Sequence, residues 1–415
     1  MKKKNQEAKS VVRLLTGNSA MRVYFAPCGI GLGHVGRCIP IARKLLENKS
    51  EIVFSTYQEG IDYVKEENFP LIKAPPIGVQ VKPDGTIDFR QTVVNPGPFL
   101  ASFKILEQVN AEIQAIESFK PNVIVSDSRL SPIVAARVLR IPRICILNQF
   151  QVIIPRKTHL LRLAKFADFI TLTIIGRMWT SGNLVLIPDF PKPYTICSGN
   201  LTIPKSYRKN VRLIGPILPV HPNSLPSKKE LRKKLRLSID KPVIFAPISG
   251  PIKEKAFLIG ILRKILLEFP DEYEVIISLG YPDTDKEPIY HGNVTIYKWV
   301  PNRFEYLKAC DLIICRAGHG TITQCMSYGK PTILVPTPSH TEQLSNARQA
   351  ENLGVAKTIQ QGELSKEKLL KSIQGLLTNK FRERLKEVQE ETLKHDGKEN
   401  AVRAIIEMAE HKQVF

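Results

Sequence analysis

Short apolar runs alternate with segments of helical periodicity along most of the chain. Near-continuous runs of Val, Ile, Leu and Phe are typical of strands buried on both faces of a sheet. Such runs lie at 23–27, 52–56, 122–126, 243–247, 275–279, 294–299, 312–315 and 332–336. Apolar residues spaced three and four apart predict helices at 37–48, 103–119, 131–139, 228–237, 256–268, 321–328 and 380–410. Strands that alternate with helices in this way favour parallel sheets.

The alternation predicts an α/β protein made of two doubly wound, Rossmann-like domains that face each other across a cleft. A chain of 415 residues is long enough for two cores. The alternation lapses at 204–226, where five prolines are typical of a linker, and Ser227 and Glu230 then predict a capping box. We expect a basic N-terminal extension (1–20), a first domain (21–203), the linker (204–226), a second domain (227–395) and a final helix (396–415) that returns to the first domain.

A glycine-rich loop follows the first predicted strand. Gly29, Gly31 and Gly33 allow the backbone to approach a phosphate, and the Gly-x-Gly-x-x-Gly spacing that begins at Gly31 also matches a dinucleotide fingerprint. That fingerprint needs an acidic residue at the end of the next strand, whereas Glu51 lies at its beginning. The sequence therefore favours a phosphate loop. Either His34 faces a substrate there as a proton acceptor, or it only packs beneath the loop.

A second glycine-rich turn lies at 315–321, between a predicted strand and a predicted helix. Unpaired N–H groups at the start of a helix attract anions, so the turn predicts a diphosphate site that needs no metal. Its candidate donors are the backbone groups of Gly318, His319, Gly320 and Thr321. The Asp-x-Asp sequence at 283–285 is expected to be a solvated turn rather than a metal site.

Residues 298–347 contain, in order, Trp-Val-Pro, Arg-Ala-Gly-x-Gly-Thr, Gly-x-Pro and His-x-Glu-Gln-x-x-Asn-Ala. This order resembles the donor site of the two-domain, B-type (GT-B) glycosyltransferases, which include the UDP-glycosyltransferases and the bacterial lipid II-forming GlcNAc transferase. The loop with His34 resembles the first-domain motif of the same superfamily. The resemblance implies a GT-B fold, a UDP-sugar donor and no cofactor.

The resemblance also implies a role for each matching residue. It implies that uracil contacts Trp299 and Val300, and that the donor diphosphate contacts Gly318, His319, Gly320 and Thr321. The donor sugar would contact Glu342 and Gln343, with further donor contacts at Gly250 and Arg316. The acceptor diphosphate would contact Gly29, Gly31 and Gly33. Gln324 stands where these families usually place a ribose-binding Glu, and its amide can still bond a ribose diol. In plant and small-molecule members an Asp at the place of Asp127 orients the catalytic histidine. The residues alone leave two options, since Asp127 can also cap the helix that begins near Ser131.

Charge points to an anionic partner. Lys and Arg number 60 against 39 Asp and Glu, a formal net charge of +21. Residues 151–180 intersperse basic side chains with Leu, Phe and Trp, a pattern that suits an anionic membrane surface or a core helix with solvated basic positions. Apolar runs are too short for a membrane span, which favours peripheral attachment. Nucleic acid is not an expected partner, because no recognition module is present.

Seven cysteines without a Cys-x-x-Cys sequence lie mostly in apolar segments, which predicts free core cysteines in a reducing compartment. The basic N-terminus lacks the apolar core of a secretory signal. Together with the charge, these features predict a peripheral protein on the cytoplasmic face of the cell membrane.

The combined hypothesis is an inverting, metal-independent glycosyltransferase with His34 as base and Asp127 as its support. It would move a sugar, with GlcNAc as the best candidate, from a UDP-sugar to a polyprenyl-pyrophosphate-linked sugar. The nearest functional likeness is to archaeal and eukaryotic enzymes that add the second GlcNAc of an N-glycan precursor. The alternatives are another lipid or small-molecule acceptor, a UDP-GlcNAc 2-epimerase, and a non-catalytic subunit that recruits a partner to a membrane. The oligomeric state is not predicted.

Overall fold

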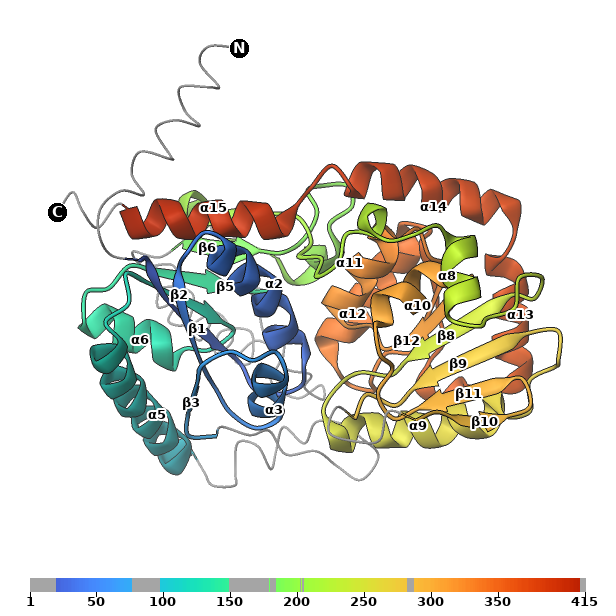
Figure 1. Ribbon diagram of the computed structural model, residues 1–415, viewed down its shortest axis with the longest axis horizontal. Helices are drawn as coiled ribbons and strands as arrows, with labels where there is room; N and C mark the ends of the chain where they lie inside the picture. Colours follow the sequence, from blue (N-terminus) through green and yellow to red (C-terminus); the bar gives the residue numbers. More distant parts are fainter. Residues whose placement is uncertain are drawn as a thin grey trace, which may run out of the picture.

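The computed structural model of the protein describes residues 20–76, 98–148, 179, 184–201, 203, 205–281 and 287–410. These residues form two α/β domains that lie side by side, each built around one sheet (Figure 1). The predicted fold class is therefore confirmed. The predicted N-terminal extension up to residue 19, the Asp-x-Asp sequence at 283–285, and the basic stretch at 151–180 apart from Trp179 lie outside the described residues.

The first sheet has seven parallel strands in the order β3-β2-β1-β4-β5-β6-β7. They are β1 (Arg22–Pro27), β2 (Glu51–Thr56), β3 (Leu71–Lys73), β4 (Val123–Asp127), β5 (Arg143–Ile146), β6 (Leu184–Ile187) and β7 (Val211–Leu213). Its helices are α2 (Gly33–Glu47), α3 (Glu59–Glu66), α5 (Pro98–Phe119) and α6 (Ser131–Val138). Apolar side chains of α2 fill the core on one face of the sheet, and those of α5 and α6 fill the core on the other. The central strands are buried for this reason.

The second sheet also has seven strands, in the order β10-β11-β9-β8-β12-β13-β14, and only β10 is antiparallel to its neighbour. They are β8 (Val243–Pro247), β9 (Glu274–Ser278), β10 (Ile289–His291), β11 (Val294–Tyr297), β12 (Leu312–Cys315), β13 (Thr332–Leu334) and β14 (Ala356–Thr358). The helices of this domain are α8 (Lys228–Lys234), α9 (Ile252–Leu266), α10 (Arg303–Ala309), α11 (His319–Ser327), α12 (Thr341–Asn352), α13 (Lys366–Leu376) and α14 (Asn379–Thr392). The helix that follows them, α15 (Gly397–Glu410), packs on the first domain. Ser227 and Glu230 form the predicted capping box at the start of α8.

The stretch predicted as a linker, 204–226, is partly a strand of the first domain. Residues Val211–Leu213 form β7, the edge strand of the first sheet, which pairs with β6. This strand is only three residues long and largely exposed, so it is too short to stand out from the surrounding prolines. The linker prediction is corrected accordingly.

A second part of the first domain reaches into the second. The segment 188–200, which follows β6 and contains the 3₁₀ helix η2 (Ile196–Asn200), contributes Phe190 and Ile196 to the core of the second domain. Cys197, one residue further on, packs in the first-domain core with Ile133 and Cys145. The segment therefore connects the hydrophobic cores of the two domains.

The tail is two helices rather than the single predicted one. α14 ends at Thr392 and α15 begins at Gly397, where Asp396 Oδ1 accepts the N–H of Glu399. Between them the chain crosses from the second domain to the first, where α15 packs against α2 and β4 (Figure 1). At the crossing, the backbones of Gly215 and Gly397 are so close that a Cβ on Gly397 would lie 2.1 Å from the carbonyl oxygen of Gly215.

All seven cysteines lie in the described ranges and are free, and all except the half-buried Cys28 are buried. The expectation of core cysteines is thus confirmed. Among the helices that the structure describes, none combines the length and the apolar character needed to cross a membrane.

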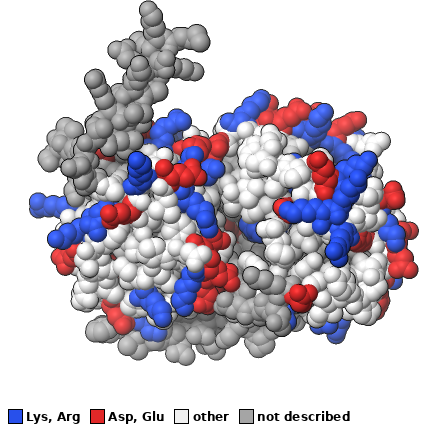
Figure 2. Space-filling model, in the orientation of Figure 1, with Lys and Arg blue, Asp and Glu red and all other residues white. Residues whose placement is uncertain are grey.

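Basic side chains gather over α8 on the second domain (Figure 2). Lys229, Lys233 and Arg236 are exposed there. Others are paired, since Lys228 and Arg232 both contact the carboxylate of Asp311. Some basic side chains of this surface are therefore neutralised locally by an acidic partner, while the net charge of +21 remains.

Candidate active site

A cavity of about 440 Å³ lies between the two domains, at the carboxyl ends of the strands of both sheets. Open α/β sheets bind ligands at this edge, and the volume suits a small-molecule ligand. The first domain contributes the loop after β1, the end of α3 and a residue after β5. The second domain contributes the loops after β8, β9, β11 and β12 and the start of α12.

The loop after β1 forms the first-domain wall. α2 begins at Gly33, four residues earlier than predicted, and Gly31 and Gly33 both line the cavity. Gly31 has a φ of +68°, which favours glycine. Gly29 is not among the described residues that line the cavity, and a Cβ there would lie 1.7 Å from the carbonyl oxygen of Tyr57. Gly29 therefore allows the loop to pack against the chain after β2, and its contact with an acceptor diphosphate stays a prediction.

His34 and Asp127 meet at this loop although 93 residues separate them in the sequence. β1 and β4 are neighbours in the sheet, with Pro27 opposite Asp127, so the end of β4 lies beside the start of α2. Nδ1 of His34 lies 2.7 Å from Oδ1 of Asp127. The carboxylate is fully buried, whereas 26% of the His34 side chain is exposed. With Nδ1–H donating to the carboxylate, Nε2 keeps a lone pair that can accept a proton.

Asp127 does not cap the helix that follows it. The N-cap residue of α6 is Leu130, and no side chain accepts a hydrogen bond from the first turn of that helix. Both carboxylate oxygens of Asp127 instead face His34 and Arg37. Of the two options left open by the sequence, the geometry favours the one in which Asp127 orients His34.

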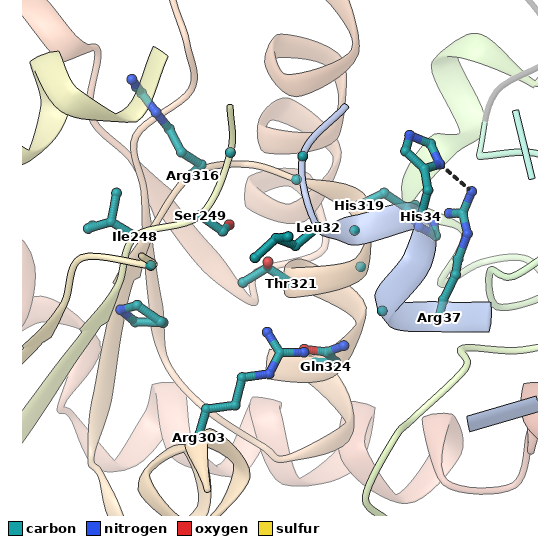
Figure 3. A pocket seen from close by; sticks show the side chains of 18 of the residues that line it. Leu32, His34, Arg37, Ile248, Ser249, Arg303, Arg316, His319, Thr321 and Gln324 are labelled. Carbon is teal, nitrogen blue, oxygen red and sulfur yellow. Dashed lines mark hydrogen bonds between the residues drawn. The ribbon is translucent and has the colours of Figure 1, made fainter. Parts of the chain in front are cut away.

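Arg37 is a partner of Asp127 that the sequence analysis missed. Its Nε and Nη2 donate to the two oxygens of Asp127, and Figure 3 shows His34 and Arg37 extending side by side from α2. Burial alone raises the pKa of the Asp127 carboxyl, but the Arg37 guanidinium and the His34 ring outweigh burial and lower the pKa to about 2. Asp127 is therefore ionised throughout the physiological range.

The start of α11 forms the opposite wall. Gly318 is its N-cap and no side chain caps its first turn, so the predicted backbone donors face the cavity from a helix N-terminus. Thr321 is an exception, because its N–H already donates to the Gly318 carbonyl at 3.1 Å. Gly250, in the loop after β8, also lines the cavity and has a φ of +123°.

The side chain of His319 points out of the cavity into the first domain. Its Nε2 lies 3.1 Å from Oδ2 of Asp189, although not in line for a hydrogen bond, and both side chains are buried. His319 can therefore offer a diphosphate its backbone N–H, while its ring contacts the Asp189 carboxylate of the first domain. Asp189 lies in a loop that no sequence pattern singled out.

Asp189, His319 and Cys197 are the group with metal-ligand chemistry among the residues that the structure describes, and their ligand atoms lie within 4.8 Å of one another. The oxygens of Asp189 already accept the backbone N–H groups of Phe190, Ile196 and Cys197 at 2.7, 3.2 and 2.8 Å. These bonds and the contact with His319 identify the group as the attachment of segment 188–200 to the second domain.

Trp299, Val300 and Gln324 line one region of the cavity, as a nucleoside site would require. The ring of Trp299 meets the edge of Tyr63 from the first domain, with centroids 6.5 Å apart. Nη2 of Arg303 lies 3.4 Å from Oε1 of Gln324, and Figure 3 shows the guanidinium and the amide pointing toward each other. Arg303 was not predicted, although it follows the Trp-Val-Pro sequence by only two residues.

Glu342, Gln343 and Arg316 differ in what they offer a ligand. Glu342, in the first turn of α12, has Oε1 at 3.5 Å from Nδ2 of Asn148 in the first domain. The Gln343 amide is engaged by its own domain, since Oε1 accepts the N–H of Thr337 and Nε2 donates toward Glu254. The guanidinium of Arg316 is 98% buried by the protein and donates to the carbonyls of Val335 and Glu254. Arg316 thus stabilises the backbone of the cavity wall through these two hydrogen bonds.

The fold has close counterparts among solved structures. Acinetobacter baumannii MurG aligns with a TM-score of 0.56 and 19% identity over 93% of this chain and 99% of that chain. The glycotransferase of kitacinnamycin aligns with a TM-score of 0.64 and 16% identity over 94% and 99%. At these identities the similarity establishes the fold alone.

Sequence comparisons add the chemical class. Residues 253–407 match the glycosyltransferase family 28 C-terminal domain. The chain is 27% identical to an uncharacterized glycosyltransferase of Methanosarcina mazei, over 95% of this chain and 100% of that protein. It is also 27% identical, over 88% of this chain and 95% of the relative, to the UDP-N-acetylglucosamine--N-acetylmuramyl-(pentapeptide) pyrophosphoryl-undecaprenol N-acetylglucosamine transferase of Caldanaerobacter subterraneus subsp. tengcongensis.

The chain is a glycosyltransferase of the GT-B fold.

The prediction of a sugar-transferring enzyme is thus confirmed, and the position of Glu51 argues against the dinucleotide interpretation of the first loop. Glu51, at the start of β2, is exposed and pairs with Arg22 at 3.1 Å, on the edge of the sheet away from the cavity. The cavity of the glycosyltransferase brings together His34, the predicted proton acceptor, and the helix N-terminus at Gly318, which come from different domains.

Proposed function

We propose that this glycosyltransferase moves GlcNAc from UDP-GlcNAc to a sugar carried on a polyprenyl pyrophosphate, with inversion and without a metal ion. The observation that carries the proposal is the buried contact between His34 and Asp127, which faces the start of α11 across one cavity. The name of the Caldanaerobacter relative, which includes UDP-N-acetylglucosamine and a pyrophosphoryl-undecaprenol acceptor, supports the donor and the acceptor class. Trp299, Val300 and Gln324 then take the nucleoside.

In the proposed reaction an acceptor hydroxyl attacks the anomeric carbon of the donor. The new bond joins the acceptor oxygen to that carbon, the bond from the carbon to the diphosphate oxygen breaks, and the hydroxyl proton passes to Nε2 of His34. Asp127 holds Nδ1–H, which fixes the tautomer that can accept this proton. A single displacement gives a β-linkage from an α-linked donor.

The departing UDP carries the negative charge that develops in the transition state. The N–H groups of Gly318, His319 and Gly320 at the start of α11 would stabilise that charge with dipoles fixed before the reaction begins. Gly250 would allow the loop after β8 to approach the same phosphates. Of the predicted sugar contacts, Glu342 is better placed than Gln343, because the Gln343 amide is already bonded to Thr337 and directed at Glu254.

The acceptor side of the proposal rests on the loop after β1. Gly31 and Gly33 line the cavity below His34 and leave room for the pyrophosphate of a lipid-linked sugar. The net charge of +21 supports peripheral attachment to an anionic membrane surface, on the cytoplasmic face where nucleotide sugars are found. Within this class, addition of the second GlcNAc of an N-glycan precursor is the acceptor that we propose.

A transfer assay tests the proposal. Labelled UDP-GlcNAc and synthetic lipid-pyrophosphate-GlcNAc are incubated with the enzyme in EDTA, with His34→Ala and the exposed control His291→Ala in parallel. We expect a lipid-linked disaccharide with wild type and His291→Ala, and loss of turnover with retained UDP binding in His34→Ala. Full activity of His34→Ala contradicts the base assignment, and a requirement for added divalent metal contradicts the leaving-group mechanism.

The same assay separates the alternatives. The cavity wall carries the carboxylates Glu66, Glu67 and Glu342, and a 2-epimerase would use acidic groups around the sugar. Conversion of UDP-GlcNAc without an acceptor would assign that activity. Transfer to a different lipid or to a small-molecule acceptor would keep the reaction and replace the N-glycan assignment. No catalysis with any acceptor, together with membrane recruitment of a partner, would identify a non-catalytic subunit.

A further inference from the structure

The Asp127 carboxylate has more partners than a base-orienting residue requires. One oxygen lies 2.7 Å from Nδ1 of His34, and Arg37 donates to both oxygens through Nε and Nη2. Nη2 of Arg37 also lies 3.2 Å from the same Nδ1, so the positive charge of Arg37 acts directly on the His34 ring. A forked guanidinium on a buried carboxylate is a strong and geometrically specific contact.

Arg37 continues the contact toward the second domain. Its Nη1 donates to Oδ1 of Asn148, which follows β5 and therefore lies next to the end of β4 in the sheet. Because Oδ1 of this amide accepts from a guanidinium, Nδ2 must face the other way. There it lies 3.5 Å from Oε1 of Glu342 across the cavity. Four side chains thus join the two domains in one line: Asp127, Arg37, Asn148 and Glu342.

The charges along this line of four side chains alternate in sign. Burial on its own lowers the pKa of the Arg37 guanidinium, but Asp127 and then Glu342 outweigh it, and the pKa is raised. A permanent positive charge therefore lies between a carboxylate of the first domain and a carboxylate of the second. The groups that face His34 are Asp127 from β4, Arg37 from its own helix and, through Asn148, Glu342 from α12.

We infer that Arg37 and Asn148 are positioning residues that align the base with the donor sugar across the cleft. Arg37 neutralises the charge of Asp127. Asp127 can then orient the His34 ring without stabilising the protonated imidazole so strongly that it does not release its proton. Asn148 transmits the position of Arg37 to Glu342 and so couples the approach of the second domain to the geometry of the base. This inference rests on the proposed function, since it takes His34 as base and Glu342 as a donor-sugar contact.

The first experiment measures the pH dependence of kcat/KM in Arg37→Met and Arg37→Lys. Removal of the positive charge beside His34 favours the protonated imidazole, so we expect the midpoint of the acid limb in Arg37→Met to rise by about one pH unit. We expect kcat to fall about tenfold or more in both variants. Arg37→Lys keeps the charge and loses the fork, so its midpoint stays near that of wild type. The control is Arg137→Met, at an exposed position on α6.

A purely structural Arg37 would give a different result. If kcat falls in Arg37→Met and the acid limb does not move, the electrostatic part of the inference is wrong. Binding of UDP and the melting temperature are measured for each variant, because Arg37→Met leaves the buried Asp127 without a guanidinium and can destabilise the first domain.

The second experiment does not disturb a buried charge. Asn148→Ala, Glu342→Gln and the double variant form a double-mutant cycle, read as kcat and as the KM for the donor. If Asn148 acts through Glu342, its effect of about three- to tenfold is largely lost in the Glu342→Gln background. Additive effects overturn the bridge. Asn352→Ala, at the exposed end of α12, is the matched control.

The two levels of the argument fail separately. If His34→Ala retains turnover, the proposed function fails and the bridge has no base to align. If His34→Ala is inactive while the cycle is additive and the acid limb of Arg37→Met is unmoved, the function stands and the bridge is removed.

Discussion

The guanidinium of Arg303 donates to Oε1 of Gln324 at 3.4 Å, so the cavity pairs a cation with a neutral amide where we propose that the nucleoside binds. This contact occupies one of the two lone pairs of the amide oxygen, so the second lone pair and Nε2 can still bond a ligand. In the proposed function a ribose diol meets a neutral amide at this point, where the resemblance to UDP-glycosyltransferases implies a carboxylate.

Gln324→Glu tests that difference. A carboxylate can accept hydrogen bonds from both ribose hydroxyls, and charge-assisted bonds are the stronger ones. We expect the KM for the UDP-sugar to fall up to about tenfold, with kcat changed less than about twofold. Isothermal titration with UDP checks the binding arm. Weaker binding would show that the new carboxylate forms an ion pair with Arg303 instead of accepting hydrogen bonds from the ribose.

Asp127→Asn is expected to reduce kcat by about a hundredfold or more, because an amide at this place no longer fixes the His34 tautomer. UDP binding should be retained, since the start of α11 is in the other domain. Asp240→Asn, at an exposed position, controls for the substitution itself. An Asp127→Asn enzyme with near-normal kcat would mean that the contact between His34 and Asp127 is structural only.

Asp127 also predicts a dependence of stability on acid. Its pKa is lowered from 3.8 to about 2 in the folded protein, so the carboxylate stabilises the fold at pH values above about 4. The contribution, about 2 kcal/mol, is lost as the pH falls from 4 toward 2. Urea midpoints at pH 7 and pH 3 check the sign: wild type should lose more stability than Asp127→Asn between them. Parallel losses in the two proteins would contradict it.

Gly397→Ala is expected to destabilise the protein by about 1–3 kcal/mol, because the new Cβ would meet the Gly215 carbonyl at 2.1 Å and backbone must move. Gly375→Ala in α13 is the matched control, since a Cβ there meets nothing within 4 Å. The control should be unchanged or stabilised by about 0.5–1 kcal/mol. Thermal melting of both variants gives the comparison, and equal melting temperatures would refute the close crossing.

Much of the fold could be predicted because its central strands are continuous apolar runs. The predictions at 23–27 and 122–126 match β1 and β4 closely, since both strands are covered by helices on two faces. Six strands were missed: β5 and β6 are buried runs of only four residues, and β3, β7, β10 and β14 are three residues long at a sheet edge. An edge strand buries too few side chains to leave a pattern in the sequence.

The candidate site was predicted where a motif supplied it and missed where only topology did. His34 stands inside a glycine motif, whereas Arg37 stands one helical turn further on and was placed at the start of the helix instead of in its second turn. Asn148 and Asp189 follow strands that were not predicted, so nothing in the sequence brought them to the cleft. The order of strands in the sheet decides which loop residues meet in the cleft, and this order cannot be derived from the pattern of a single sequence.

The return of α15 to the first domain has a consequence for how the protein is made. Ala401, Val402 and Ile405 belong to the same buried cluster as Val23 and Phe25 of β1. During synthesis, domains generally fold as they emerge, N-terminal first. Here the core that contains the first strand stays incomplete until the last helix has left the ribosome. A nascent chain that ends anywhere before α15 therefore exposes an apolar face on α2, and the first domain cannot be produced by cutting the chain after residue 203.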